Sequence, residues 1–275
     1  MTHARGRPGR PARPASGPRR PTAITSLQSN ERPRHRNWCF YGQSGAGKTA
    51  LAGTAPNALF LATDPEGTES ARELGSTADE LPVNTWTEFL EYADWIVRGD
   101  AHEQYQYVIL DTVDELEELI WQEQLVNDEL KRASKYQPNK GDYPVVWRKL
   151  RAELNALNRA PISVIYLNHM MHIDREDEEG DTVTLAMPEM GSRKRGDLSS
   201  WFCAQMGLVG YMRIVRQEGG AEERHLMTST TERYIAKDRT TKFGAGIVNP
   251  TIPGMLATIG SSNNTTARRR TRRAA

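Results

Sequence analysis

The chain has 275 residues, a formal net charge of +1 and two cysteines, Cys39 and Cys203. The two cysteines are isolated, which predicts reduced thiols and argues against a disulfide framework or a Cys-based metal site. There is no apolar run of about 20 residues, so we expect no membrane partner and a cytoplasmic protein without a secretory signal.

The charge is distributed unevenly along the chain. Residues 1–36 carry nine Arg and one Glu, and residues 261–275 carry five Arg and no acid, which leaves a net of −12 for residues 37–260. The arginine-rich ends hold few large apolar side chains, so we expect disordered tails at 1–36 and 260–275 around one domain at 37–259. Such tails bind nucleic acid through its phosphates or are simply solvated extensions, and composition favours neither.

A phosphate-binding loop lies near the start of the predicted domain. A short buried strand at 38–41 precedes it and a helix start follows it, which is the expected context for this loop. The pattern G-x-x-x-x-G-K-[ST] predicts that ATP is bound by backbone N–H groups and by a lysine, with a hydroxyl on Mg²⁺. The residues concerned are Gly42, Gln43, Ser44, Gly45, Ala46, Gly47, Lys48 for the β/γ-phosphates and Thr49 for the metal.

The next segments alternate between helix and buried strand. The helix after the loop must be short because Gly53 and Pro56 interrupt it. The apolar run 58–62 predicts a parallel strand that ends in the polar cluster 63–67. A capping-box pattern opens a helix over 85–97, whose predicted buried face comprises Phe89, Leu90, Ala93 and Ile96.

A second strand ends in an acid. Residues 107–110 are apolar and Asp111 follows them, which is the Walker B form and predicts a ligand for the Mg²⁺ or for Thr49. Helices are expected over 113–134 and 145–158, and a further strand over 162–167 that ends in Asn168-His169.

The remaining segments are shorter. We expect a hairpin-like strand over 181–187 and a short helix over 197–205. The last strands are predicted at 208–215, 224–228 and 234–235. The order of elements predicts an α/β domain with a mostly parallel central sheet flanked by helices.

Thr112 follows Asp111 directly, which argues against those classes in which a catalytic Glu follows the Walker B acid. Five motifs occur in a specific order along the chain. They are the phosphate loop, Phe-Leu-x-x-Asp-x-Glu-Gly at 60–67, Asp-Thr-x-Asp-Glu-Leu at 111–116, a strand ending in His, and a late Ala-Lys-Asp-Arg. In this order the chain resembles the phage-encoded ATP-binding AAA-domain family, which contains RecA-like single-strand annealing ATPases. The resemblance covers roughly residues 37–250 and implies a RecA-like P-loop NTPase fold.

The resemblance implies roles for individual residues. Glu66 resembles the RecA-type base that polarises the attacking water, with Asp64 as the alternative. His169 is similar in place to the polar residue that senses the γ-phosphate. Lys237 and Arg239 resemble the basic finger that reaches the nucleotide of a neighbouring subunit, and a plain basic strand end is the alternative interpretation.

The resemblance also implies function and partners. It implies a magnesium-dependent ATPase that acts on single-stranded DNA in phage recombination, annealing or replication, in the cytoplasm of a bacterial host. The implied partners are single-stranded DNA, other copies of the chain with the ATP site at the subunit interface, and a single-strand-binding protein. Alternative interpretations are a nucleotide-dependent DNA-binding scaffold with little turnover and a small-molecule kinase. Expected DNA-contacting segments are residues 131–143 and 170–196.

Overall fold

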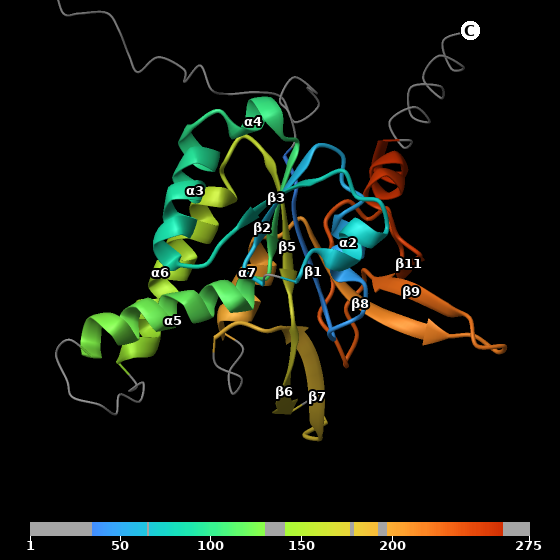
Figure 1. The fold of residues 1–275 in the computed structure, drawn as a ribbon. Coiled ribbons are helices and arrows are strands. Elements are labelled where there is room, and N and C mark those ends of the chain that lie inside the picture. The colour runs from blue at the N-terminus through green and yellow to red at the C-terminus, as the bar shows by residue number, and fades with distance from the viewer. Residues whose placement is uncertain (1–34, 65, 130–140, 177–178, 192–196, 261–275) are drawn as a thin grey trace, which may run out of the picture. The chain divides into compact units, whose positions relative to one another are not determined.

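A computed structural model describes residues 35–64, 66–129, 141–176, 179–191 and 197–260, and of 124–129 the backbone alone. In these residues a nine-stranded sheet has the order β11-β9-β8-β1-β5-β4-β2-β3, with β10 paired to β8 (Figure 1). Neighbours from β8 to β3 are parallel, whereas β9, β10 and β11 pair antiparallel. The strands are β1 (Asn37–Gly42), β2 (Ala58–Ala62), β3 (Asp79–Pro82), β4 (Tyr107–Asp111), β5 (Ser163–Asn168), β8 (Leu208–Arg216), β9 (Glu222–Met227), β10 (Lys237–Asp238) and β11 (Gly246–Val248).

Helices cover both faces of this sheet, because the central strands are apolar on both sides. In β1, Cys39 and Tyr41 pack into the core beneath α3, α5 and α6, while Trp38 and Phe40 pack into the core on the α1 side. The helices are α1 (Lys48–Ala52), α2 (Glu69–Glu73), α3 (Trp86–Arg98), α4 (Ala101–Gln104), α5 (Val113–Glu129), α6 (Asp142–Leu157) and α7 (Asp197–Gln205), and residues 252–260 are also helical.

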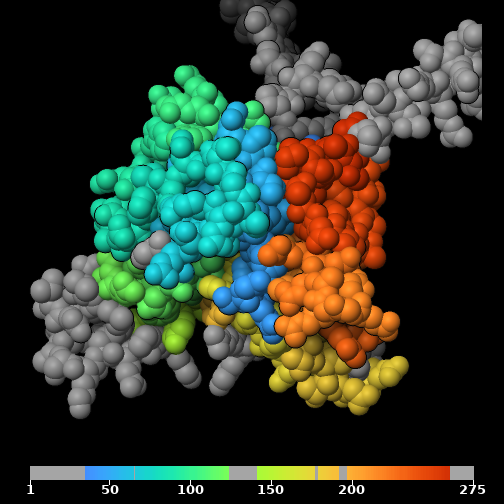
Figure 2. All heavy atoms as spheres, turned by 45° about the vertical axis from the view of Figure 1, so that its right-hand side comes forward, coloured from blue at the N-terminus to red at the C-terminus, as the bar shows by residue number. Residues whose placement is uncertain are grey.

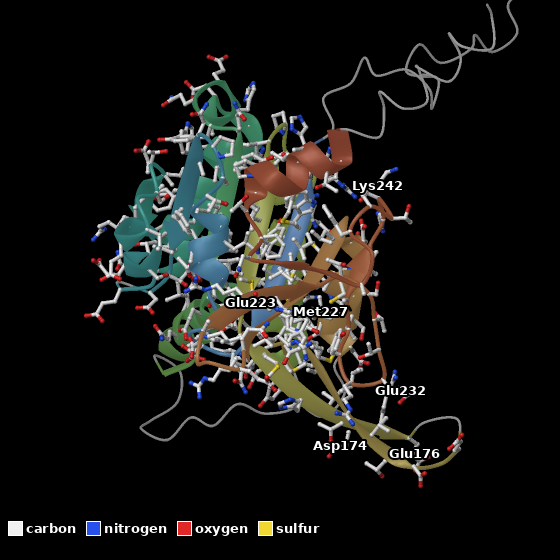
Figure 3. The ribbon with its side chains drawn as sticks, turned by 90° about the vertical axis from the view of Figure 1, so that its right-hand side faces the viewer. Asp174, Glu176, Glu223, Met227, Glu232 and Lys242 are labelled. Carbon is white, nitrogen blue, oxygen red and sulfur yellow. The ribbon has the colours of Figure 1, made fainter. Side chains whose placement is uncertain are left out.

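A separate two-stranded sheet follows β5. Strands β6 (Met170–Glu176) and β7 (Thr182–Pro188) pair antiparallel and extend away from the main sheet. Figure 3 shows Asp174 and Glu176 toward the far end of this ribbon. Gly180 at φ 88° lies in the turn between the strands, where the left-handed backbone favours glycine. Because β6 begins two residues after β5 ends, the β6–β7 hairpin starts beside the end of β5.

The predicted α/β domain with a mostly parallel central sheet flanked by helices is confirmed. The strands expected at 58–62 and 107–111 and the short helix after the loop are found at the predicted positions. Two expectations are wrong. Residues 234–235 form no strand, because Tyr234 makes a single bridge to Ala186 and pairing with β8 begins at Lys237. Leu90 is 37% exposed, and Trp86 fills the predicted buried face of α3 instead.

Several predictions concern residues that lie outside the described part of the chain. They are the tails apart from residues 35, 36 and 260, and the basic clusters Lys131, Arg132, Lys135, Lys140 and Arg193, Lys194, Arg195. In the described part, no helix is long and apolar enough to cross a membrane.

Candidate active site

The parallel strands bring most of the predicted residues to one edge of the sheet. In the order β1-β5-β4-β2, the carboxyl ends of all four strands meet where open α/β sheets bind their ligands. A cavity of about 520 Å³ opens at this edge. Figure 2 shows the blue start of the described chain at the surface between the cyan region around α2 and the orange β8–β9 region. The cavity is lined by Ser44, Gly45, Gly47, Lys48, Thr49, Ala50, Asp64, Glu66, Gly67, Ser70, Glu73, Leu74, Asp111, Thr112, Glu115, His169 and Arg224.

The loop between β1 and α1 forms one wall of the cavity. Gly45 at φ 76° and Gly47 at φ 92° have left-handed backbones that side chains rarely adopt, so the loop curls tightly. Lys48 is buried and its Nζ donates to the carbonyl oxygens of Gly42 at 3.1 Å and Gln43 at 3.0 Å. Burial lowers the pKa of Lys48, partly offset by the charge of Asp111. The ammonium group of Lys48 therefore lies inside the curl of the loop, where it would meet a bound anion.

Thr49 and Asp111 form the hydroxyl and carboxylate pair of the site. Thr49 Oγ1 donates to Asp111 Oδ2 at 2.7 Å, so β4 and α1 are joined directly at the cavity floor. Burial raises the pKa of Asp111 to about 6, although the bond from Thr49 and the charge of Lys48 act in the opposite direction. A buried carboxylate with so little compensating charge is suited to receive a cation.

His169 also lines the cavity, and an acid holds it in place. His169 Nδ1 lies 2.6 Å from Asp114 Oδ2, and the His169 backbone N–H donates to Asp114 Oδ1 at 2.9 Å. The bond to Asp114 raises the pKa of His169, against the effect of burial. Asp114 belongs to the first turn of α5, so the end of β5 is tied to the helix that follows Asp111.

Exposed carboxylates face the other side of the cavity. Glu66 and Asp64 both line it, and the Glu66 backbone N–H donates to Asp64 Oδ1 at 3.1 Å. Glu115 also lines the cavity, from α5. Partial burial is the larger cause that raises the pKa of Glu115, and the negative charge of Asp114 is the next. The structure therefore brings both predicted candidates for the base, and a third acid, to the same cavity.

Lys237 and Arg239 do not line this cavity. Lys237 Nζ donates to the carbonyl oxygens of Cys203 and Ala204, both at 3.0 Å. An Arg239 guanidinium N–H donates to Ala204 O at 2.7 Å. Both cations thus cap the last turn of α7, where helix carbonyls lack intrahelical partners.

The sequence analysis did not predict the place of Glu115 in the cavity, the contact of Asp114 or the presence of Arg224. The contact between His169 and Asp114 was not predicted, although an acid three positions after a Walker B residue is a usable signal once the strand order is known. Arg224 lines the cavity from β9, about 180 positions after the loop, and no local pattern in the sequence marks it.

The residues fit a magnesium ion that is shared with a phosphate chain. In the described residues, no cluster of three or more His, Cys, Asp or Glu side chains is arranged to hold a metal alone. Thr49 and Asp111 supply two oxygens, and Mg²⁺ usually takes one or two protein ligands together with phosphates and water.

Comparison with known proteins places the chain in a family. A family model described as an AAA domain matches residues 34–240, so the chain belongs to the AAA-domain family. Among solved structures, the flagellar accessory protein FlaH from Methanocaldococcus jannaschii is similar, with a TM-score of 0.40 and 9% identity over 79% of this chain and 85% of that chain. No curated protein matches the chain.

Proposed function

We propose that this AAA-domain protein binds Mg²⁺·ATP in the cavity at the carboxyl edge of the sheet and hydrolyses it. One observation carries the proposal. Lys48, Thr49 and Asp111 line a single cavity, and the hydroxyl of Thr49 lies 2.7 Å from the Asp111 carboxylate. The lysine and the hydroxyl beside a curled glycine-rich loop, together with the acid at the end of β4, fit a triphosphate and its metal ion.

Each side chain has a defined task in this proposal. Lys48 exchanges its two carbonyl partners for the phosphate oxygens, while Thr49 and Asp111 hold the Mg²⁺. When bound, the metal ion supplies positive charge that neutralises the phosphate oxygens. Glu66 accepts a proton from the attacking water, with Asp64 as its alternative. His169, positioned by Asp114, reports on the terminal phosphate.

A groove beside the hairpin supports single-stranded DNA as the second ligand. This groove of about 570 Å³ lies between β7, β8 and the segment around Tyr234. Tyr211 and Tyr234 lie in it with ring centroids 4.9 Å apart, and Arg213 and Arg233 are exposed along it. Aromatic faces next to cations suit unstacked bases and a phosphate backbone. Glu232 is the acidic member of the lining.

The proposal also covers the association of copies of the chain and the cellular process that they serve. Copies of the chain associate, and Lys237 and Arg239 of one copy leave α7 to complete the ATP site of the next. The assembly serves phage recombination, annealing or replication in the cytoplasm of a bacterial host, alongside a single-strand-binding protein. The basis for these finer points is the resemblance of the sequence motifs.

Replacing the proposed base tests hydrolysis. Glu66→Gln removes the proton acceptor but leaves the loop intact, so ATP binding should persist while turnover falls on the order of a hundredfold. Glu73→Gln is the matched control, because Glu73 lines the same cavity from α2 and is not a candidate for the base. Phosphate release and nucleotide affinity are measured with the full chain and Mg²⁺.

The same assay separates the alternatives. Addition of a single-stranded oligonucleotide should raise turnover of the wild-type chain more than addition of the matching duplex. Tight ATP binding without turnover in the wild type favours a DNA-binding scaffold, and phosphate transfer to a small molecule favours a kinase. Unchanged turnover in Glu66→Gln removes Glu66 from the mechanism and makes Asp64 or Asp114 the next candidates.

A further inference from the structure

Arg224 reaches the phosphate-binding loop from a distant part of the same chain. It belongs to β9, the strand that Figure 3 marks with Glu223 and Met227. A Cβ atom added to Gly47 would overlap the Nε and Cδ atoms of Arg224 and would lie 3.4 Å from its Cζ. The side chain is therefore packed directly against the loop residue that precedes Lys48.

The guanidinium group has no partner within the described part of the chain. No hydrogen bond or ion pair of the Arg224 side chain is found there, whereas the neighbouring cation Arg216 pairs with Glu222 at 3.0 Å. Arg224 is exposed and lines the cavity. A cation held at a cavity wall without a carboxylate partner is available to an anion that enters the cavity.

The charge balance of the cavity favours a role for this group. Lys48 and Arg224 are the Lys and Arg side chains in its described lining. The acidic side chains of the lining are carboxylates, which repel a polyphosphate. The acids concerned are Asp64, Glu66, Glu73, Asp111 and Glu115. Lys48 alone is a weak counterweight to this negative field, so a second cation next to the loop contributes substantially to anion binding.

The backbone N–H and the carbonyl oxygen of Arg224 both form hydrogen bonds to one residue, Asn249. The Arg224 N–H donates to Asn249 Oδ1 at 2.9 Å, and the Asn249 N–H donates to Arg224 O at 2.6 Å. Asn249 adopts φ 45°, a left-handed conformation that asparagine tolerates better than most residues. This pairing, just beyond the end of β11, holds the start of the Arg224 side chain in one position over Gly47.

We infer that Arg224 is a phosphate-binding residue that acts in cis, clamping the phosphate chain of the nucleotide against the loop of its own subunit. The inference rests on the proposed nucleotide binding, but it assigns a residue outside every motif of the sequence. It also differs from the Lys237 and Arg239 finger, which serves a neighbouring copy. The planar guanidinium can donate two N–H groups to phosphate oxygens at once.

Equilibrium binding of ATP, ADP and AMP tests the inference. The variants are Arg224→Ala, Arg224→Lys, which keeps the charge but loses the fork, and Arg216→Ala as a matched arginine on the same hairpin. Arg224→Ala should weaken ATP and ADP binding by about tenfold or more, since hydrogen bonds to charged groups contribute about 1.5–3 kcal/mol. AMP affinity should change much less. Arg224→Lys should recover part of the loss, and Arg216→Ala should match the wild type.

Other outcomes have distinct meanings. If the wild type binds no nucleotide, the proposed function itself fails. If the wild type binds ATP and Arg224→Ala binds it equally well, Arg224 is not a phosphate ligand. An equal loss for AMP, ADP and ATP would place Arg224 on the α-phosphate, sugar or base that the three share, and would overturn its assignment to the phosphate chain beyond the α-phosphate. Thermal melting of each variant shows whether Arg224→Ala is folded, and a folded variant with unchanged affinity contradicts the inference.

Discussion

Asp111, a proposed ligand of the metal ion, lowers the stability of the fold at neutral pH through its buried charge. Its carboxylate is buried, and burial raises its pKa from 3.8 to about 6. Because the folded-state pKa lies above the unfolded value, ionisation of Asp111 destabilises the fold as the pH rises through the window from 3.8 to about 6. Above this window the nucleotide-free protein carries the full penalty, which the positive charge of a bound metal ion would offset.

We therefore predict that Asp111→Asn stabilises the nucleotide-free protein at neutral pH. Asparagine removes the buried charge and can still accept the bond from Thr49, so the free energy of unfolding at pH 7.5 should rise by up to about 3 kcal/mol. The advantage should shrink as the pH falls below about 4, where the wild-type carboxyl is protonated. Urea unfolding at both pH values measures it. An Asp111→Asn protein less stable than the wild type at both values contradicts the prediction.

The functional residues differ in how far the sequence reveals them. Lys48, Thr49 and Asp111 lie in motifs with fixed spacing, so their meeting at one cavity is predictable. The bond between Asp114 and His169 joins residues 55 positions apart and depends on β4 and β5 being neighbours. Arg224 is less predictable, since only the position of the β8–β9 hairpin brings it to the loop.

Among the elements, the short strand β10 and the residue after it carry the two cations proposed to complete the ATP site of a neighbouring copy. Its Lys237, and Arg239 just beyond it, cap the carbonyls of α7, while its backbone pairs with β8. Asp238 fixes the following turn by accepting bonds from the backbone N–H groups of Thr240 at 2.7 Å, Lys242 at 2.8 Å and Phe243 at 3.1 Å. Both cations thus have a local structural role in addition to the proposed role in a neighbouring ATP site.

Arg239→Ala distinguishes these two roles. Loss of the cap alone should lower the free energy of unfolding by about 1 kcal/mol and leave ATP turnover intact. We predict in addition that turnover is lost while ATP binding persists, since a finger stabilises charge on the transferred phosphoryl group by roughly 10³–10⁵ in rate. Mixing Arg239→Ala with Lys48→Ala should then restore part of the activity. A mixture that stays inactive while subunits exchange would remove the trans role.

The elements that the sequence predicts best are those with strong patterns. Apolar runs identify β2 and β4, and the Thr85 cap marks the start of α3, where Glu88 N–H donates to Thr85 Oγ1 at 3.1 Å. Most of the elements that were missed are short or polar, although the apolar helix over 252–260 was missed as well. The edge strand β3, for example, has an exposed or half-exposed side chain at every position and depends on pairing with β2 for its conformation.

At the scale of the whole molecule, the two proposed ligands are both anions while residues 37–260 carry a net charge of −12. Binding must therefore depend on local cations that are placed by the fold. Lys48 and Arg224 line the cavity proposed for the nucleotide, and Arg213 and Arg233 line the groove proposed for DNA. Composition predicts the acidic body, but these local placements require the three-dimensional fold.

Magnesium-dependent ATP turnover by the purified full chain, with Lys48→Ala beside it, tests the central claim most directly. The matched control is Lys149→Ala, since Lys149 pairs with Glu123 at 3.7 Å on the helical face away from the loop. We predict phosphate release by the wild type and Lys149→Ala that stops when Mg²⁺ is chelated, and at least about a hundredfold less release by Lys48→Ala, since the charge on the phosphates is no longer stabilised. Equal release by Lys48→Ala and the wild type would contradict the account.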